Sequence, residues 1–171
     1  MKLLSDWGFS LEGLRTGNKG EYWFLAQALI VIIFPFLPAY RPIWLALNSA
    51  SYLYFNWGVA AILALIALVF LGKGLIDLGK QLTPLPYPKE DGELVQTGIY
   101  SLVRHPLYSG LIFLTLSWAI FQMSLTHLFA ALTLFIVLNA KASKEEAWLS
   151  AKFPEYAEYR QKVKKLIPGL Y

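Results

Sequence analysis

Residues 97–110, TGIYSLVRHPLYSG, hold the densest group of reactive and conformationally restricted side chains in this apolar chain. Proline lacks an amide hydrogen and has a fixed φ, so Pro106 suits the first position of a helix and His105 should lie just outside it. The N–H groups of that first turn, with Arg104 beside them, would form an anion-binding site. The alternative is an interfacial cap, in which the arginine snorkels to the membrane surface and tyrosines anchor the helix end.

A second group of ionisable residues is the adjacent pair Glu145 and Glu146. Neighbouring residues on a helix point about 100° apart, so only one of the two can face a pocket fully. A solvated, charged helix start is the alternative interpretation of this pair. The two groups are the places where the sequence concentrates chemistry.

Several kinds of site are disfavoured by composition. The chain has no cysteine, which excludes disulfides, thiolate metal sites and a cysteine nucleophile. Its two isolated histidines argue against a metal site. Neither a G-x-G-x-x-G fingerprint after a strand nor a P-loop occurs, so any small-molecule cofactor must bind without a Rossmann domain.

The composition predicts a membrane protein. Hydrophobic residues make up 57% of the 171 residues and charged residues only 15%, whereas soluble domains carry about 25% charged residues. The mean hydropathy is +0.49. Six tryptophans and ten tyrosines suit the two membrane interfaces. The net charge of +4 does not indicate nucleic-acid binding, because the basic residues cluster at the predicted membrane ends.

We expect an all-α, polytopic integral membrane protein forming one domain over residues 1–171. An N-terminal segment, residues 1–21, is predicted to be a short helix lying on the membrane surface. About four transmembrane helices should follow, at residues 22–40, 52–72, 106–122 and 125–139. Amphipathic helices should complete the chain from residue 140.

Prolines and short lengths qualify two of these segments. Pro35 and Pro38 should kink or end the first span. The last two spans are each shorter than about 20 residues, and they are separated by little more than Met123 and Ser124. A helical hairpin crossing the membrane is expected, with a re-entrant hairpin as the alternative. His127 near its tip is interpreted as an interface residue.

The C-terminal segment should contain two helices. Aromatic and aliphatic residues from Trp148 to Val163 form one stripe at helical spacing. Pro154 is expected to divide the segment, and Pro168 with Gly169 to stop its second helix.

Charge predicts the orientation. Every lysine and arginine except Arg41 falls within residues 1–21, 73–105 or 140–171. The positive-inside rule then places both termini and the 97–110 segment in the cytoplasm.

The chemistry-bearing segments together resemble a known family. The order ELVQTGIYSLVRHPLYSG, an apolar hairpin, KEEAWLSAKFPEYAEY and KKLIPGLY is similar to isoprenylcysteine carboxyl methyltransferases. That family belongs to a wider group of membrane methyltransferases that includes phospholipid N-methyltransferases. The resemblance covers residues 93 to 168, and the first two spans match only in hydrophobic character.

The resemblance implies a methyltransferase that uses S-adenosylmethionine, bound in a cytoplasm-facing pocket between segments 93–110 and 140–168. By motif position, the cofactor-binding residues would be Leu94, Gly98, Tyr100, Arg104, His105, Pro106 and Tyr108, with Glu145 and Glu146 closing the pocket.

The acceptor implied by the resemblance is a lipophilic molecule from the bilayer, most like an isoprenylcysteine carboxylate. Such a carboxylate needs no base, whereas an amine acceptor would need Glu145 or Glu146 to take a proton. Arg160 could orient an acidic acceptor. Two positions depart from the family pattern: Lys165 stands where arginine is common, and Pro154 stands where glycine is common.

Two other functions stay open from the sequence. One is an NADPH-dependent membrane reductase acting on a sterol or enone lipid. The other is a non-catalytic membrane scaffold that retains the fold. Neither a metal nor a nucleic acid is expected as a partner.

Overall fold

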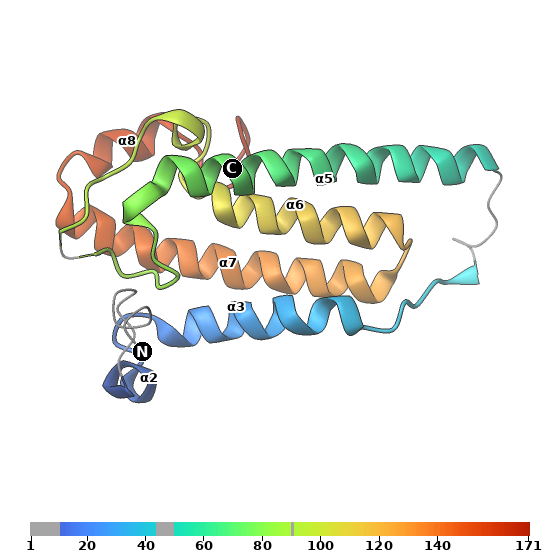
Figure 1. The fold of residues 1–171 in the computed structure, drawn as a ribbon, viewed down its shortest axis with the longest axis horizontal. Helices are drawn as coiled ribbons and strands as arrows, with labels where there is room; N and C mark the ends of the chain where they lie inside the picture. The colour runs from blue at the N-terminus through green and yellow to red at the C-terminus, as the bar shows by residue number, and fades with distance from the viewer. Residues whose placement is uncertain (1–10, 44–49, 90) are drawn as a thin grey trace.

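The computed structural model describes residues 11–43, 50–89 and 91–171. The long helices lie side by side along the long axis of the molecule (Figure 1): α3 (Glu21–Ile33), α5 (Ala50–Leu78), α6 (Pro106–Phe121) and α7 (Leu125–Lys152). The short helices α2 (Leu11–Thr16) and α8 (Tyr156–Lys162) lie at one end. Within the described ranges the fold is helical, and the prediction of an all-α chain is confirmed. Of the predicted surface helix over residues 1–21, residues 1–10 lie outside the described ranges, and the rest contains the short helix α2 and the start of α3.

Prolines end the first long helix early. Helix α3 (Glu21–Ile33) passes into the 3-10 turn η1 (Phe34–Phe36). Pro35 occupies the start of this turn, where its missing N–H breaks the α-helical hydrogen-bond series. The predicted span of residues 22–40 is therefore shorter in the structure.

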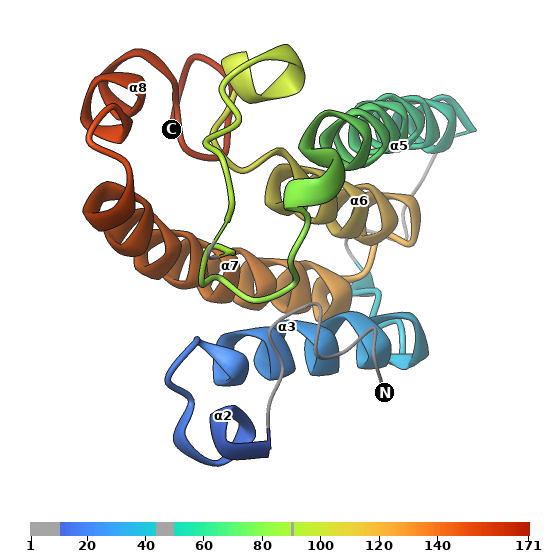
Figure 2. The same cartoon turned by 60° about the vertical axis from the view of Figure 1, so that its left-hand side comes forward.

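Helix α5 (Ala50–Leu78) is longer than the predicted span of residues 52–72. It continues through Lys73 and Asp77, which form an i,i+4 ion pair of 3.4 Å, and ends in the turn η2 (Gly79–Gln81). The Pro-rich segment after η2, described at residues 82–89 and 91–97, is irregular and crosses the end of the bundle (Figure 2). We call it the strap.

Helices α6 (Pro106–Phe121) and α7 (Leu125–Lys152) form the predicted hairpin. Met123 turns with a φ of 48°, and the Ser124 hydroxyl accepts a hydrogen bond from the His127 amide at the start of α7. The interpretation of His127 as an interface residue is wrong, because its side chain is buried, bonds to Ser124 at 2.9 Å and packs edge-on against Phe34.

Helix α7 does not stop at residue 139 as predicted. It runs unbroken to Lys152, because the sequence after Asn139 is rich in alanine, lysine and glutamate, which favour helix. The polar residues beyond residue 139 therefore extend the same helix.

The tightest packing joins α5 and α6. A Cβ added at Gly110 would lie 2.6 Å from Leu71, so only glycine allows this approach. The Ser117 hydroxyl donates to the Ala60 carbonyl at 2.7 Å. These contacts set the position of the α6 N-terminus beside the end of α5.

The C-terminal segment folds back onto the 97–110 region. Pro154 divides α7 from α8 as predicted. The prediction that Pro168 and Gly169 end the second helix is wrong, because α8 ends at Lys162. The chain beyond it pairs with the 97–110 segment: the amides of Arg104 and His105 donate to the carbonyls of Lys164 and Lys165 at 2.8 and 3.1 Å.

Within the described ranges, two helices, Ala50–Gln81 and Leu125–Lys152, are long and apolar enough to cross a membrane, judged by length and composition alone. The α3–η1 and α6 segments are shorter apolar helices. Apolar side chains on the outer surface of the bundle are exposed, among them Leu29, Leu65, Val69, Phe129 and Ile136. Such a surface suits an apolar surrounding.

Candidate functional site

The entry to α6 is built as predicted. Pro106 is its first residue, and His105 lies outside it with a φ of −125°. The expected free amides are only partly present, because the Tyr108 N–H donates to the His105 carbonyl at 3.1 Å. The helix start is therefore not a bare anion-binding site.

Gly98 fixes the approach of the 97–110 segment to α5. Its φ is 63°, a conformation that favours glycine. A Cβ there would lie 2.1 Å from the Asp77 carboxylate. That carboxylate accepts a hydrogen bond from the Ile99 amide at 2.8 Å. Gly98 thus lets the 97–110 segment approach α5 closely enough for Asp77 to bind it.

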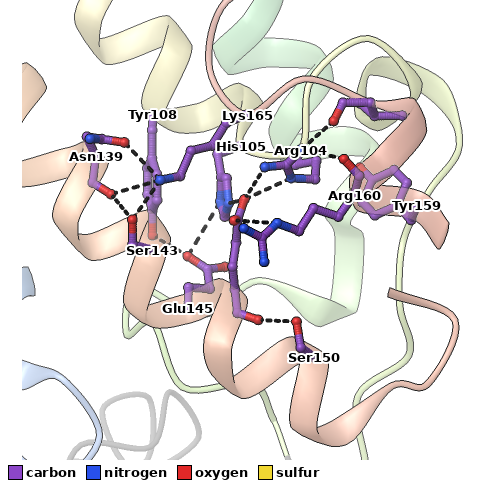
Figure 3. Close-up of polar contacts among 12 residues, drawn as sticks. Arg104, His105, Tyr108, Asn139, Ser143, Glu145, Ser150, Tyr159, Arg160 and Lys165 are labelled. Carbon is purple, nitrogen blue, oxygen red and sulfur yellow. Dashed lines mark hydrogen bonds and ion pairs between the residues drawn. The ribbon is translucent and has the colours of Figure 1, made fainter. Parts of the chain in front are cut away.

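Glu146 is the centre of a buried ionic cluster, and Figure 3 shows its partners Arg104, His105 and Arg160 close together. The Arg104 guanidinium donates to Glu146 Oε1 through Nε and lies 2.8 Å from it through Nη2 as well. His105 Nε2 lies 3.1 Å from the same oxygen. Arg104 Nη1 donates to the carbonyls of Arg160 and Val163. The guanidinium is therefore used to join α6, α7 and α8.

Glu145 points to a different neighbour. Its Oε2 accepts a 2.7 Å hydrogen bond from the Tyr108 hydroxyl and lies 3.6 Å from His105 Nδ1. The side chain is partly exposed, at 26%, against 6% for Glu146. The prediction that only one of the pair can face a pocket fully agrees with this divergence.

A cavity lies beside Glu145, at the end of the bundle that carries α8. Its wall includes Leu94, Tyr100, Arg104, Glu145, Tyr156 and Tyr159. We call it the tyrosine cavity. Its volume is about 90 Å³, and part of its wall is the irregular strap. Four of its six named residues were predicted as site residues.

The two tyrosines from α8 were missed by the sequence analysis, which assigned them to a packing stripe. Tyr159 donates its hydroxyl to the Tyr100 carbonyl at 2.6 Å. The Tyr156 hydroxyl is buried and has no hydrogen-bond partner among the described residues. Burial raises the pKa of Tyr100, Tyr156 and Tyr159, so all three remain neutral phenols at physiological pH. The i,i+3 spacing of Tyr156 and Tyr159, after the Glu145–Glu146 pair, was the sequence pattern that could have identified them as site residues.

The remaining predicted residues do not line the tyrosine cavity. Pro106 is buried at the start of α6, and His105 stacks on Tyr108 with ring centroids 5.3 Å apart. Arg160 is 61% exposed, with Nε 3.9 Å from Glu146 Oε2. Lys165 donates to the Asn139 side chain at 2.9 Å and to the Ser143 hydroxyl at 2.7 Å, so it joins the C-terminal segment to α7 (Figure 3).

Comparison with known proteins gives a consistent result. Residues 55–156, more than half of the chain, match the phospholipid methyltransferase family. The chain is 37% identical over 86 residues to a methanethiol S-methyltransferase of Pseudomonas deceptionensis, and 36% identical over 92 residues to a methanethiol S-methyltransferase of Bradyrhizobium diazoefficiens. It is also 32% identical over 114 residues to the cobalt-zinc-cadmium resistance protein CzcN of Cupriavidus metallidurans.

These similarities cover parts of each protein. They include 50%, 53% and 62% of this chain, and 32%, 29% and 50% of the respective relatives. The chain thus spans about a third of the length of the two methanethiol relatives. In the part of the chain that the structure describes, no three histidine, aspartate or glutamate side chains come together as metal ligands.

Proposed function

The chain belongs to the phospholipid methyltransferase family, and on this premise we propose that it transfers a methyl group from S-adenosylmethionine to a lipophilic acceptor drawn from the bilayer. The observation that carries the proposal is the position of Glu145. It is held by Tyr108, stands apart from the buried Arg104–Glu146 pair, and lines the tyrosine cavity.

The chemistry of the tyrosine cavity fits such a cofactor. S-adenosylmethionine carries an ammonium and a sulfonium, and Glu145 offers a carboxylate to either charge. Tyr100, Tyr156 and Tyr159 offer aromatic faces to a cation or to adenine. The partnerless Tyr156 hydroxyl is a buried group that a bound ligand would satisfy.

The residues divide into those that would hold the cofactor and those that hold the site. Leu94, Tyr100, Glu145 and Tyr156 would contact it from the cavity wall. His105 and Arg104 keep Glu146 buried and so fix the turn of α7 that presents Glu145. When bound, the cofactor supplies an electrophilic methyl group, and the protein supplies alignment and a site shielded from water.

The size of the tyrosine cavity sets a condition on binding. Small-molecule pockets usually measure about 300–1,000 Å³, which exceeds the 90 Å³ present. Part of the wall must therefore move outward when the cofactor binds. Residues 92–95 are an irregular part of that wall, and we expect the movement there.

We propose that the protein is a multi-pass membrane protein with both termini and the tyrosine cavity on the cytoplasmic side. The basic residues support this orientation. Arg41 lies at the opposite end of the bundle, where its guanidinium donates to the Gln122 carbonyl at the end of α6 at 2.7 Å.

Three acceptor chemistries suit the proposal. The resemblance of the motifs favours an isoprenylcysteine carboxylate. The names of two relatives point to a thiol, and the family name points to a phospholipid amine. All three would reach the site from the apolar phase.

Calorimetric titration of the purified protein with S-adenosylhomocysteine tests the cofactor, with NADPH titrated in parallel. We expect micromolar binding of S-adenosylhomocysteine, loss of binding in Glu145→Gln, and unchanged binding in the control Glu158→Gln, an exposed residue of α8. Binding of NADPH alone would support a reductase. Binding of neither ligand by folded protein would support a scaffold.

A further inference from the structure

Lys141 is a buried lysine that forms no ion pair with a carboxylate among the described residues. It lies in α7, one turn before Glu145, and is 1% exposed. Its Nζ donates to the Gln27 side-chain carbonyl at 2.8 Å and to the Pro84 carbonyl at 2.9 Å. It also lies 5.0 Å from the ring centre of Tyr108. Among the described residues, no carboxylate forms an ion pair with it.

Such a site is electrostatically incomplete. A buried charge is stable only when it is paired or well hydrogen-bonded. An ammonium has three N–H donors, and two neutral carbonyls accept from Lys141. The Tyr108 ring adds a weak cation–π attraction. The surroundings satisfy the hydrogen bonds in part, and the Glu145 carboxylate, one turn along α7, attracts the charge without forming an ion pair with it.

Lys141 lies at a second cavity, which we call the lysine cavity. Its volume is about 240 Å³, and its wall includes Gln27, Leu71, Leu75, Leu107, Leu111 and Lys141. The wall is mostly apolar, and Leu75 is exposed on the outer surface of α5. An apolar molecule in the bilayer would therefore meet an apolar entrance and, inside, a single cation.

The lysine cavity adjoins the tyrosine cavity. Thr83 lines both. Tyr108 lines the lysine cavity, and its hydroxyl bonds to Glu145, which lines the tyrosine cavity. The two cavities thus share a lining residue and are linked by the Tyr108–Glu145 hydrogen bond. Methyl transfer needs two such sites in direct contact.

We propose that the lysine cavity binds the methyl acceptor, and that Lys141 selects a small lipophilic acceptor whose reacting atom is negatively charged, a thiolate or a carboxylate. This inference rests on the proposed methyltransferase function. An ammonium acceptor would be repelled by Lys141, whereas an anion would complete its pairing. The volume is below the usual range for drug-sized ligands, so it suits a small acceptor or the reacting end of a longer one.

The charges balance in this scheme. The acceptor loses its proton to water before it binds. Its anionic sulfur or oxygen then forms a bond to the methyl carbon, the bond from that carbon to the donor sulfonium breaks, and the electron pair stays on the donor sulfur. One anion and one cation become two neutral groups. Glu145 need not act as a base, which agrees with its hydrogen bond from Tyr108.

Four six-carbon probes test the selection: hexanoate, hexanethiol, hexan-1-ol and hexylamine, titrated against the protein in lipid nanodiscs with S-adenosylhomocysteine present. We expect hexanoate to bind about tenfold tighter than hexan-1-ol, the effect of one close charge pair. Hexylamine, as its ammonium, should bind more weakly than hexan-1-ol. Hexanethiol, which is largely un-ionised at neutral pH, should bind about as tightly as hexan-1-ol.

Two variants test the role of the Lys141 charge, one by removing it and the other by pairing it. Lys141→Met should abolish the preference for hexanoate and leave hexan-1-ol binding unchanged. Gln27→Glu keeps the lysine and gives it an internal carboxylate, so it should abolish the preference without emptying the cavity and serves if Lys141→Met does not fold. Lys144→Met, on an exposed face of the same helix, should keep the preference.

The outcomes separate this inference from the proposed function. If wild-type protein fails to bind S-adenosylhomocysteine, the methyltransferase proposal fails. If it binds S-adenosylhomocysteine but takes hexanoate and hexan-1-ol equally, the acceptor inference is overturned alone. Lys141-dependent binding of dihexanoyl phosphatidylethanolamine, in preference to hexanoate, would also overturn it, because the lysine would then recognise a headgroup phosphate.

Discussion

Glu145 and Glu146 are adjacent in α7 but belong to different structures. Glu146 is buried and accepts from Arg104 and His105, whereas Glu145 accepts from Tyr108 and lines the tyrosine cavity. Two adjacent residues of α7 therefore have different roles. Glu146 joins α7 to the start of α6 and to α8, and Glu145 is placed to contact a ligand in the cavity.

Replacing each glutamate by glutamine should affect different properties, stability for Glu146 and ligand binding for Glu145. Glu146→Gln leaves Arg104 without its anion in a buried site, and breaking a buried ion pair costs about 3–5 kcal/mol. We expect a much lower unfolding temperature. Glu145→Gln should change stability by about 1 kcal/mol or less and remove S-adenosylhomocysteine binding. Thermal unfolding and calorimetry measure the two effects, and equal loss of stability in both variants would contradict the division.

The two tyrosines of α8 offer a matched pair. Tyr156→Phe removes a buried hydroxyl without a partner, so the ligand-free protein should be as stable as wild type or more stable, by about 1 kcal/mol. Tyr159→Phe removes the 2.6 Å hydrogen bond to the Tyr100 carbonyl and should destabilise by about 1 kcal/mol. Thermal unfolding without ligand compares them. Destabilisation by Tyr156→Phe would mean that its hydroxyl has a partner in solution.

Stability should fall in alkaline solution. Burial raises the pKa of Tyr100, Tyr156 and Tyr159 in the folded protein, whereas an unfolded tyrosine has a pKa of about 10. Above that pH the unfolded chain loses protons that the folded chain keeps, so the stabilisation present below it decreases as pH rises. Unfolding temperatures measured from pH 8 to 11 should drop above about pH 10, less steeply in Tyr159→Phe. An identical slope in that variant would contradict the assignment.

Gly98 can be separated from a glycine that is merely exposed. In Gly98→Ala, a left-handed backbone conformation costs roughly 1–2 kcal/mol, and the new Cβ would also clash with Asp77. Gly169 has a similar φ of 72° and nothing within 4 Å of its added Cβ. Gly169→Ala should therefore show the backbone cost alone. Thermal unfolding should rank Gly98→Ala as clearly the less stable, and equal stabilities would exclude the clash as a cause.

Local rules predicted much of the framework. Pro106 begins α6, Pro154 divides the C-terminal helices, and the turn at Met123 and Ser124 forms the hairpin, because each depends on a few adjacent residues. The divergence of Glu145 and Glu146 followed from helix geometry alone. These features need no knowledge of distant parts of the chain.

Long-range pairing could not be predicted in the same way. Nothing local indicates that the amides of Arg104 and His105 meet the carbonyls of Lys164 and Lys165, or that Lys141 reaches Gln27 and Pro84. The predictions for the end of α8 and for the location of His127 were wrong for this reason. Each is decided by a partner far away in the sequence.

Helix α7 fixes the distances of Lys141 and Glu145 from its first residue, Leu125. It runs without a break from Leu125 to Lys152, and a helix rises 1.5 Å per residue. Lys141 therefore lies about 24 Å along it from Leu125, and Glu145 about 6 Å further. In the proposed topology, the two cavities are thus set at constant levels relative to the opposite membrane surface. The protein should consequently work best in bilayers whose thickness brings the acceptor's reacting end to the level of Lys141, and a thicker or thinner bilayer would put the acceptor out of register with it.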